Sequence, residues 1–289
     1  QRMAPETSKA NTPDSTEGAS SGTRSSANVL TYKADLYGGV LIDPAGLPSD
    51  PEQFRLALGT SLQLWSQEGK NGVWLKLAIE LAVLIPIATA EFGFQFHHAE
   101  STYVMLNKWL PTNKPSTLPP NASHTIGVGA LVLDRAGRVL LLRERAGPAA
   151  RLGMWKLPTG LVEAGEEIHE AAVREVREET GIEAVFDSVS GFWSSHYLYN
   201  TAHPGKSNLY FVVRCLAKTT EISIQESEIA EAKWFTLEEK GKLPYPLKGS
   251  APDVLDSIAL SGADVLEAKR LQLRAGPVWT YVAAPRSAL

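Results

Sequence analysis

The sequence of 289 residues contains one cysteine, Cys215, so an internal disulfide is excluded. The fold therefore does not depend on an oxidising compartment. Cys215 lies in the apolar run YFVVRCLA, which favours a buried structural thiol over a nucleophile.

Long apolar runs and an excess of basic residues are also missing. The longest uncharged apolar run, Leu81 to Ala90, is too short to cross a membrane and contains Pro86. The net charge is −4, with 28 Lys and Arg against 32 Asp and Glu, which argues against nucleic-acid binding through phosphate neutralisation. We therefore expect no membrane partner and no nucleic-acid partner.

Composition divides the chain into segments. Residues 1–29 are rich in Ser, Thr, Ala, Pro and Gly and lack a hydrophobic period, which predicts a disordered leader. Residues 30–110 combine strand-like and helical patterns and predict a small mixed α/β domain, with helices over Asp50–Ser66 and, kinked or interrupted at Pro86, over Ile79–Glu91. A Pro-, Thr- and Asn-rich linker at 111–123 precedes a second domain at 124–245, in which we expect a loop over Ala146–Met154 and a short strand over Trp155–Leu157. For residues 246–289 we expect a helical extension.

Within the first domain, the pair His97-His98 invites a metal-site interpretation. Adjacent side chains on a strand point to opposite faces, so the two rings cannot chelate one ion. We expect packing or hydrogen bonding at this pair instead.

The stretch from Gly160 to Ile182, GLVEAGEEIHEAAVREVREETGI, has the period of an amphipathic helix with acids on its inward side. Glycines mark its ends, because Gly165 suits a tight entry loop and Gly181 suits a left-handed helix end. The period places six residues on the inward face: Ile168, Ala171, Ala172, Glu175, Val176 and Glu179.

Inward carboxylates need a positive partner, because removing an ionised carboxylate from water is costly. Glu178 lies beside Glu175 and Glu179 on this helix. Arg174 can pair with Glu178, but one guanidinium cannot neutralise three converging carboxylates. A divalent cation that prefers oxygen ligands is the natural remaining partner.

This stretch resembles the Nudix box, GX5EX7REUXEEXGU, where U is a bulky aliphatic residue. Nine positions carry the resemblance: Gly160, Glu166, Arg174, Glu175, Val176, Glu178, Glu179, Gly181 and Ile182. The stretches GVWLKL, FGFQFHHAE, YVMLNKWLP and NASHTIGVGA extend it over roughly residues 35–240. They are similar to a two-domain subgroup with plant ADP-ribose and NADH pyrophosphatases and the fibroblast-growth-factor-antisense Nudix protein. The resemblance implies a Nudix α/β/α sandwich preceded by a small mixed α/β N-terminal domain.

The resemblance further implies a Nudix pyrophosphatase that uses Mg²⁺ or Mn²⁺ and splits ADP-ribose and NADH to give AMP. Glu175, Glu178 and Glu179 would be its metal ligands. The carbonyl near Gly160 would add a ligand, and Glu166 would pair with Arg174 to orient the helix.

The family usually needs one more carboxylate from a later loop, as a metal ligand or general base. Glu228 stands six residues before Trp234 and is the preferred residue, with Glu226 and Glu231 as alternatives.

The substrate site is less determined by the sequence. Trp193, His196, Tyr197 and Tyr210 offer rings for a base, although each ring also fits ordinary packing. Arg143 or Lys206 would meet a phosphate. Leu198 stands where typical ADP-ribose enzymes have a proline, and the SQPWPFPxS stretch of classical NADH pyrophosphatases is absent.

Several alternatives stay open. One is a nucleotide-sensing protein without turnover, and another is a Nudix enzyme for CoA or diphosphoinositol polyphosphates. The polar leader and the start at Gln1 resemble a secreted oomycete avirulence effector of the Nudix type, which would act in a host cytoplasm; otherwise we expect a cytoplasmic enzyme. A prolyl isomerase (cyclophilin) acting at Gly147-Pro148 and a homodimer are further possible partners.

Overall fold

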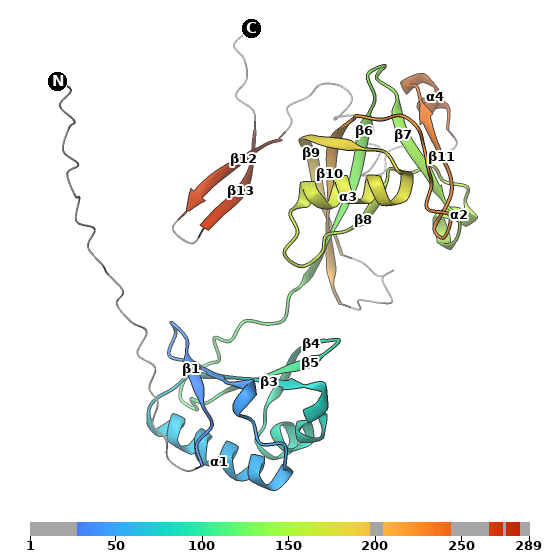
Figure 1. The fold of residues 1–289 in the computed structure, drawn as a ribbon. Coiled ribbons are helices and arrows are strands. Elements are labelled where there is room, and N and C mark those ends of the chain that lie inside the picture. Colours follow the sequence, from blue (N-terminus) through green and yellow to red (C-terminus); the bar gives the residue numbers. More distant parts are fainter. Residues whose placement is uncertain (1–27, 197–204, 244–265, 274–275, 284–289) are drawn as a thin grey trace, which may run out of the picture. The chain divides into compact units, whose positions relative to one another are not determined.

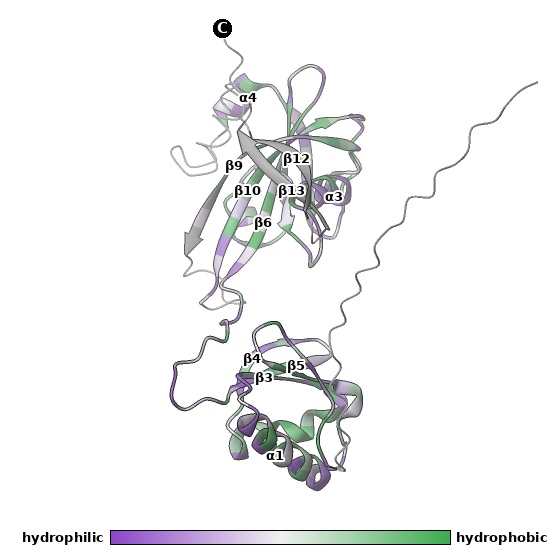
Figure 2. Ribbon diagram, turned by 90° about the vertical axis from the view of Figure 1, so that its left-hand side faces the viewer, coloured by the Kyte–Doolittle hydropathy of each residue, from purple (hydrophilic) through white to green (hydrophobic). Residues whose placement is uncertain are grey.

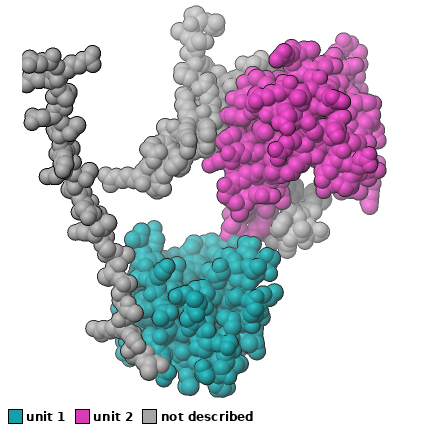
Figure 3. All heavy atoms as spheres, viewed as in Figure 1, with its two compact units in different colours: residues 1–121 teal, residues 122–289 magenta. Residues whose placement is uncertain are grey.

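The computed structural model describes residues 28–196, 205–243, 266–273 and 276–283. The chain divides into two compact units at residue 121 (Figure 3). No helix in these described ranges is both long and apolar enough to cross a membrane.

The first unit is a five-stranded sheet with its helical segments packed on one face (Figure 1). The strand order is β1-β2-β3-β5-β4, and β2 runs parallel to β3. The strands are β1 (Tyr32–Ala34), β2 (Val40–Ile42), β3 (Gly72–Ala78), β4 (Gln95–Glu100) and β5 (Tyr103–Trp109). The short helix η1 (Pro44–Gly46) follows β2.

Helix α1 (Pro51–Gln67) supplies most of the cover for this sheet. The Asp50 carboxylate accepts a hydrogen bond from the Gln53 N–H at 2.9 Å, and Pro51 suits the first turn, so both residues start the helix. Its inward stripe is spaced for a helix and is buried: Phe54, Ala57, Leu58, Ser61, Leu62 and Trp65.

Two sequence predictions in this unit are corrected. We expected a helix over Ile79–Glu91, interrupted at Pro86, but the chain forms a 3₁₀ segment η2 (Ile79–Leu84) and a π-helical turn η3 (Ile87–Glu91). Pro86 cannot donate a backbone hydrogen bond, so no continuous α-helix forms across it.

The second correction concerns His97 and His98. A bulge in β4 shifts the register between Phe96 and His98, so the alternation of faces fails there. The Nδ1 atoms of the two rings lie 2.7 Å apart, and His98 Nε2 lies 3.2 Å from the Tyr103 hydroxyl. The expected hydrogen bonding is present, but the opposite-face argument is wrong.

The second unit is built on a sheet of order β11-β7-β6-β10-β9-β12-β13, with β8 paired to β6. Its strands are β6 (His124–Leu133), β7 (Val139–Glu144), β8 (Thr159–Leu161), β9 (Ala184–His196), β10 (Ser207–Ala217), β11 (Ile229–Phe235), β12 (Leu266–Leu273) and β13 (Gly276–Ala283). Helix α3 (Ile168–Thr180) lies against the sheet, and α2 (Gly147–Arg151) and α4 (Leu237–Lys242) are short.

Figure 2 shows hydrophobic residues along β6, at the centre of this sheet, and the buried clusters cover both of its faces. Val128, Ala130 and Val132 of β6 pack with the α3 side, whereas Leu131 belongs to the cluster on the other face. A strand buried on both faces reads as a continuous apolar run, as VGALVL does here. Cys215 is fully buried in the α3-side cluster, and burial raises the pKa of its thiol to about 12, which fits the predicted structural role.

Three further predictions fail locally. The helical extension is wrong over Leu266–Leu273, which is a strand paired with β13, and its residues before 266 lie outside the described ranges. The loop over Ala146–Met154 contains the helix α2. The strand Trp155–Leu157 is a single bridge between Leu142 and Lys156, and pairing resumes at β8.

Candidate active site

The acidic site is assembled from β8 and helix α3. β8 pairs with β6, with Gly160 opposite Val128, so the entry to the box is part of the sheet and not a free loop. A Cβ on Gly160 would lie 1.8 Å from Oε1 of Glu175. Only glycine leaves room for this carboxylate against the strand.

Helix α3 presents its acids at graded depths. Ala171, Ala172 and Val176 are fully buried, and this anchors the inward stripe predicted from the sequence. Glu179 is 5% exposed, and the side chains of Glu175 and Glu178 are 14% and 48% exposed. Gly181 ends the helix with φ of 69°, as its position predicted. The three carboxylates therefore run from the core edge to the surface.

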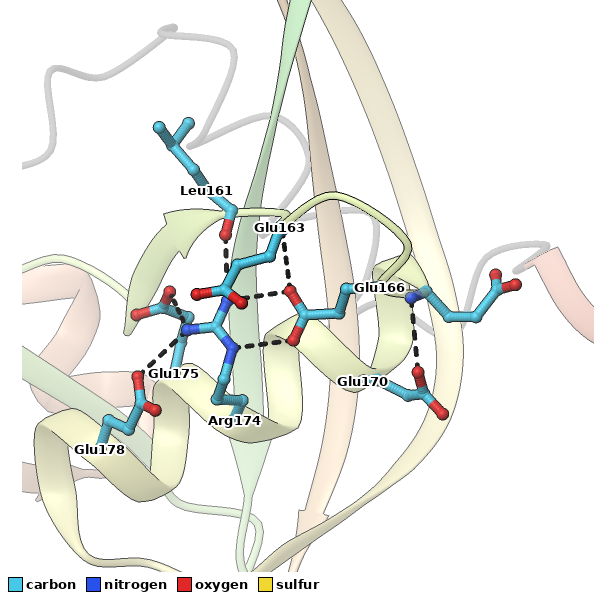
Figure 4. Close-up of polar contacts among 8 residues, drawn as sticks. Leu161, Glu163, Glu166, Glu170, Arg174, Glu175 and Glu178 are labelled. Atoms are coloured by element: carbon cyan, nitrogen blue, oxygen red, sulfur yellow. Dashed lines mark hydrogen bonds and ion pairs between the residues drawn. The ribbon is translucent and has the colours of Figure 1, made fainter. Parts of the chain in front are cut away.

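Arg174 is the centre of the ion-pair network (Figure 4). Its Nε and Nη2 donate to Glu166 at 2.7 and 3.0 Å, and Nη2 also donates to the Leu161 carbonyl at 3.0 Å. Nη1 donates to Glu175 at 2.7 Å and to Glu178 at 3.1 Å. The hydrogen bonds from Arg174 hold the pKa of Glu166 below its ordinary value.

Glu179 interacts with a different set of groups, Thr159 and Lys156. Its Oε2 accepts a hydrogen bond from the Thr159 N–H at 3.0 Å. Lys156 Nζ donates to Thr159 Oγ1 at 2.9 Å and forms an ion pair with Glu144. Burial raises the pKa of Glu179 to about 7, although the charge of Lys156 and the Thr159 hydrogen bond oppose the rise. The carboxylate is thus a buried acid that a further positive charge would help to ionise.

These donors suit a hard divalent ion, because all are carboxylate oxygens beside a glycine that admits close approach. As the side chains lie, no group of three acidic, His or Cys side chains in the described ranges converges closely enough to hold one. The reason is visible in the network: Nη1 of Arg174 takes up Glu175 and Glu178.

The segment that carries the predicted general base is attached to the end of α3. Ser223 and Gln225 donate backbone hydrogen bonds to the carbonyls of Thr180 and Glu179 at 2.9 and 3.2 Å. The turn from Gln225 to Ile229 then leads into β11. Glu226 and Glu228 lie in this turn, one and three residues after Gln225. Glu231 instead forms ion pairs with Arg143 and Lys233.

The predicted substrate residues fall into two groups. Trp193 and His196 lie on β9, where their backbones pair with Tyr210 and Ser207 of β10, whereas Tyr197 lies outside the described residues. Lys206 precedes β10 and donates to the Ala122 carbonyl.

Arg143 lies apart from that group, on β7. Its guanidinium faces the Trp155 ring at 5.7 Å, and β6 and β10 separate β7 from β9. The sequence therefore named residues that do not form one cluster.

Lys156, Thr159 and Glu144 were missed by the sequence argument. Lys156 immediately precedes the buried Leu157 and stands four positions before Gly160. This alternation of a polar and a buried residue, so close to the box, was the available sequence signal for Lys156. Its role depends on the bridge to Leu142, a long-range pairing that local pattern does not show.

The comparisons with known proteins now identify the class. Residues 123–257 match the NUDIX domain model, and residues 30–110 match the model described as a Nudix hydrolase domain. The chain belongs to the Nudix hydrolase family, and it is an enzyme of the Nudix pyrophosphatase kind, acting on substrates that contain a pyrophosphate. Nudix hydrolases in general use divalent metal ions.

Among its relatives, Nudix hydrolase 2 of Arabidopsis thaliana is 43% identical over 75% of this chain and 76% of its own length. Nudix hydrolase 8 of the same plant is 46% identical over 73% of this chain, which spans only 56% of that relative. The human nucleoside diphosphate-linked moiety X motif 6 is 36% identical over 74% of this chain and 67% of its own length.

Among solved structures, a MutT protein from Methanosarcina mazei covers 48% of this chain and 96% of its own, with 26% identity and a TM-score of 0.39.

Proposed function

We propose that the protein hydrolyses the diphosphate bond of ADP-ribose and of NADH, with Mg²⁺ or Mn²⁺ bound by Glu175, Glu178 and Glu179. Water supplies the new oxygen on phosphorus, and AMP leaves with ribose 5-phosphate or reduced nicotinamide mononucleotide as the second product. The observation that carries the metal-dependent hydrolysis is the set of three carboxylates on α3, of which Glu175 packs against Gly160 and Glu179 accepts a hydrogen bond from Thr159. The choice of ADP-ribose and NADH rests on the resemblance to the plant pyrophosphatases.

A bound divalent ion would neutralise the diphosphate oxygens and lower the pKa of the attacking water. The chain's own part is to hold the ligands. Glu175 and Glu178 would exchange Nη1 of Arg174 for the ion, while Glu166 and the Leu161 carbonyl keep the rest of the guanidinium in place. The backbone N–H of Thr159 fixes the orientation of Glu179.

Glu228 is proposed as the general base that takes the proton from water. The backbone bonds of Ser223 and Gln225 to the end of α3 support this choice, because they place the following turn beside the box helix. Glu231 is the weaker alternative, since Arg143 and Lys233 already pair with it.

For base recognition we propose Trp193 or His196, which stand three positions apart on β9 and therefore on opposite faces of the strand, and for phosphate recognition we propose Lys206. Strand β9 ends at His196 and the antiparallel strand β10 begins at Ser207, which pairs with His196 and follows Lys206. Arg143 would then bind a second phosphate, or it would only pack against the Trp155 ring.

The test is a substrate panel of ADP-ribose, NADH, CoA and a diphosphoinositol polyphosphate, with Mg²⁺ or Mn²⁺ and identification of every product. We expect AMP from the first two substrates. Glu178→Gln and Glu179→Gln should each lower kcat by at least about 10²-fold, the scale seen when one electrostatic group is removed from an active site.

Glu170→Gln is the matched control, because Glu170 is an exposed acid on the same helix. Retained turnover in both box variants would refute the metal assignment. Tight nucleotide binding without any product would instead favour a sensor.

Action in a host cell, a homodimer and activation by a prolyl isomerase stay predictions. Pro148 stands in the first turn of α2, where its restricted φ suits a helix start. Adding a cyclophilin to the freshly refolded enzyme should raise its turnover; unchanged turnover with an active cyclophilin would end the isomerase hypothesis.

A further inference from the structure

A cavity of about 480 Å³ lies in the first unit, entirely among residues 93–121. Its walls come from β4 and β5 and from the segment after β5, so it shares no residue with the acidic site on α3. The volume lies within the range of small-molecule sites, roughly 300–1,000 Å³.

The segment after β5 forms a packed wall of this cavity. Leu118 lies over Gly72, where an added Cβ would come within 2.4 Å of its Cδ2. The Trp109 indole N–H donates to the Lys114 carbonyl at 3.1 Å, and the Leu118 N–H donates to Ser116 Oγ at 3.2 Å. The space left by the absent side chain at Gly72 is thus filled by Leu118, and this contact packs the linker against the sheet.

Two polar groups of the lining residues lack a hydrogen-bond or ion-pair partner among the described residues. Nε2 of His97 is buried and has no hydrogen-bond partner, while its Nδ1 lies against His98. Lys108 lines the same cavity and forms no ion pair or hydrogen bond with the rest of the described chain. The lining contains no Asp or Glu. Nε2 of His97 is closed to solvent, so the Lys108 ammonium, and not this nitrogen, is available to a ligand, and an ammonium without a partner favours an anionic ligand.

Aromatic surface stands beside these groups. Phe96 is 67% exposed at the cavity although it is a large apolar side chain, and Trp109 lies on the same wall. Rings of this kind stack on planar ligands. An ammonium next to ring faces favours a ligand that is both anionic and planar.

We propose that this cavity binds a purine nucleoside monophosphate. Lys108 pairs with the phosphate, and Phe96 and Trp109 contact the base. The site is separate from the pyrophosphatase site and does not depend on the substrates proposed for it.

The experiment uses the full chain and 8-azido-AMP as a photolabel, followed by peptide mapping. We expect labelling within residues 93–121 that unlabelled AMP displaces. Adenosine should compete about tenfold more weakly than AMP, because it lacks the charge that Lys108 meets. The map separates this site from the catalytic one, whose label would fall on other peptides.

Lys108→Met should weaken labelling of these peptides about tenfold and abolish the preference for AMP over adenosine. Lys108→Arg should keep most of it. Lys33→Met is the matched control, because Lys33 is an exposed lysine on β1, at the other edge of the same sheet, and does not line the cavity. Label confined to peptides of residues 122–289, no displaceable label at all, or equal competition by AMP and adenosine would each overturn the proposal.

Discussion

At the residue scale, the absence of a side chain at Gly160 makes room for a carboxylate. Glu175 occupies the space that a side chain on β8 would fill, with its Oε1 only 1.8 Å from the position of a Cβ. Glycine is therefore required here for packing against the strand, and every larger residue must displace Glu175.

Gly160→Ala should lower kcat about 10²-fold while leaving the fold intact, because displacement of one ligand by about 1 Å is enough for such a loss. Steady-state kinetics and circular dichroism of the variant test this. Gly241→Ala is the control, since an added Cβ at Gly241 meets no atom within 4 Å. Equal activity of the two variants would contradict the prediction.

Lys156 acts on Glu179 through charge and through Thr159. Because the Lys156 charge lowers the pKa of Glu179, Lys156→Met should raise that pKa above its value near 7, and Lys156→Arg should not. Carbon-13 NMR of the labelled carboxyl groups in metal-free protein measures the shift. An unchanged midpoint in Lys156→Met would show that Lys156 acts only through position.

At the scale of elements, the β6–β7 hairpin depends on one buried carboxylate. Asp134 accepts hydrogen bonds from the backbone N–H groups of Ala136 and Arg138 at 2.9 and 2.8 Å and from the Arg138 side chain at 2.7 Å. Burial alone would raise the pKa of Asp134, but these bonds outweigh it and hold the pKa below its ordinary value.

The sign of the pH effect follows from that shift. A lowered folded-state pKa stabilises the hairpin above the ordinary Asp pKa of about 3.9, and the stabilisation is lost as pH falls through the folded value. Asp134→Asn should therefore open the hairpin more than wild type at pH 7, and the difference should shrink below about pH 4. Hydrogen exchange of peptides from residues 124–144 measures it; a difference independent of pH would refute the assignment.

Elements also show where local pattern is sufficient. The α1 and α3 stripes were readable because capping residues, helical spacing and end glycines agree with burial in the sheet. The helical extension expected over residues 246–289 failed at Leu266–Leu273, because this segment pairs with β13 and such pairing is decided by the partner strand and not by the period of one segment. The bulge in β4 likewise altered the facing of His97 and His98.

At the scale of the whole molecule, the two units have separate cores. One cluster joins α1 with β3 and β5 in the first unit, and two clusters surround the sheet of the second. No buried residue is shared between these clusters in the described ranges.

Independent cores predict independent losses of stability. Leu58→Ala should destabilise the first unit by about 2–5 kcal/mol, and it should leave metal-dependent turnover near wild type below the unfolding temperature. Val176→Ala, equally buried but on the box helix, is the counterpart that should affect the second unit. Calorimetry with a parallel activity assay tests both; a loss of turnover in step with Leu58→Ala unfolding would show coupled units.

The sequence by itself determined the acidic helix, its glycine boundaries, the family and the enzyme class, because these depend on spacing within one continuous stretch. Tertiary structure alone decided that Arg174 also pairs with Glu175, that Thr159 donates a hydrogen bond to Glu179 beside Lys156, and that the linker forms one wall of a cavity at β5. Those contacts join residues that sheet pairing and burial bring together. The period of a single segment encodes neither the pairing partner of a strand nor the residues buried against it.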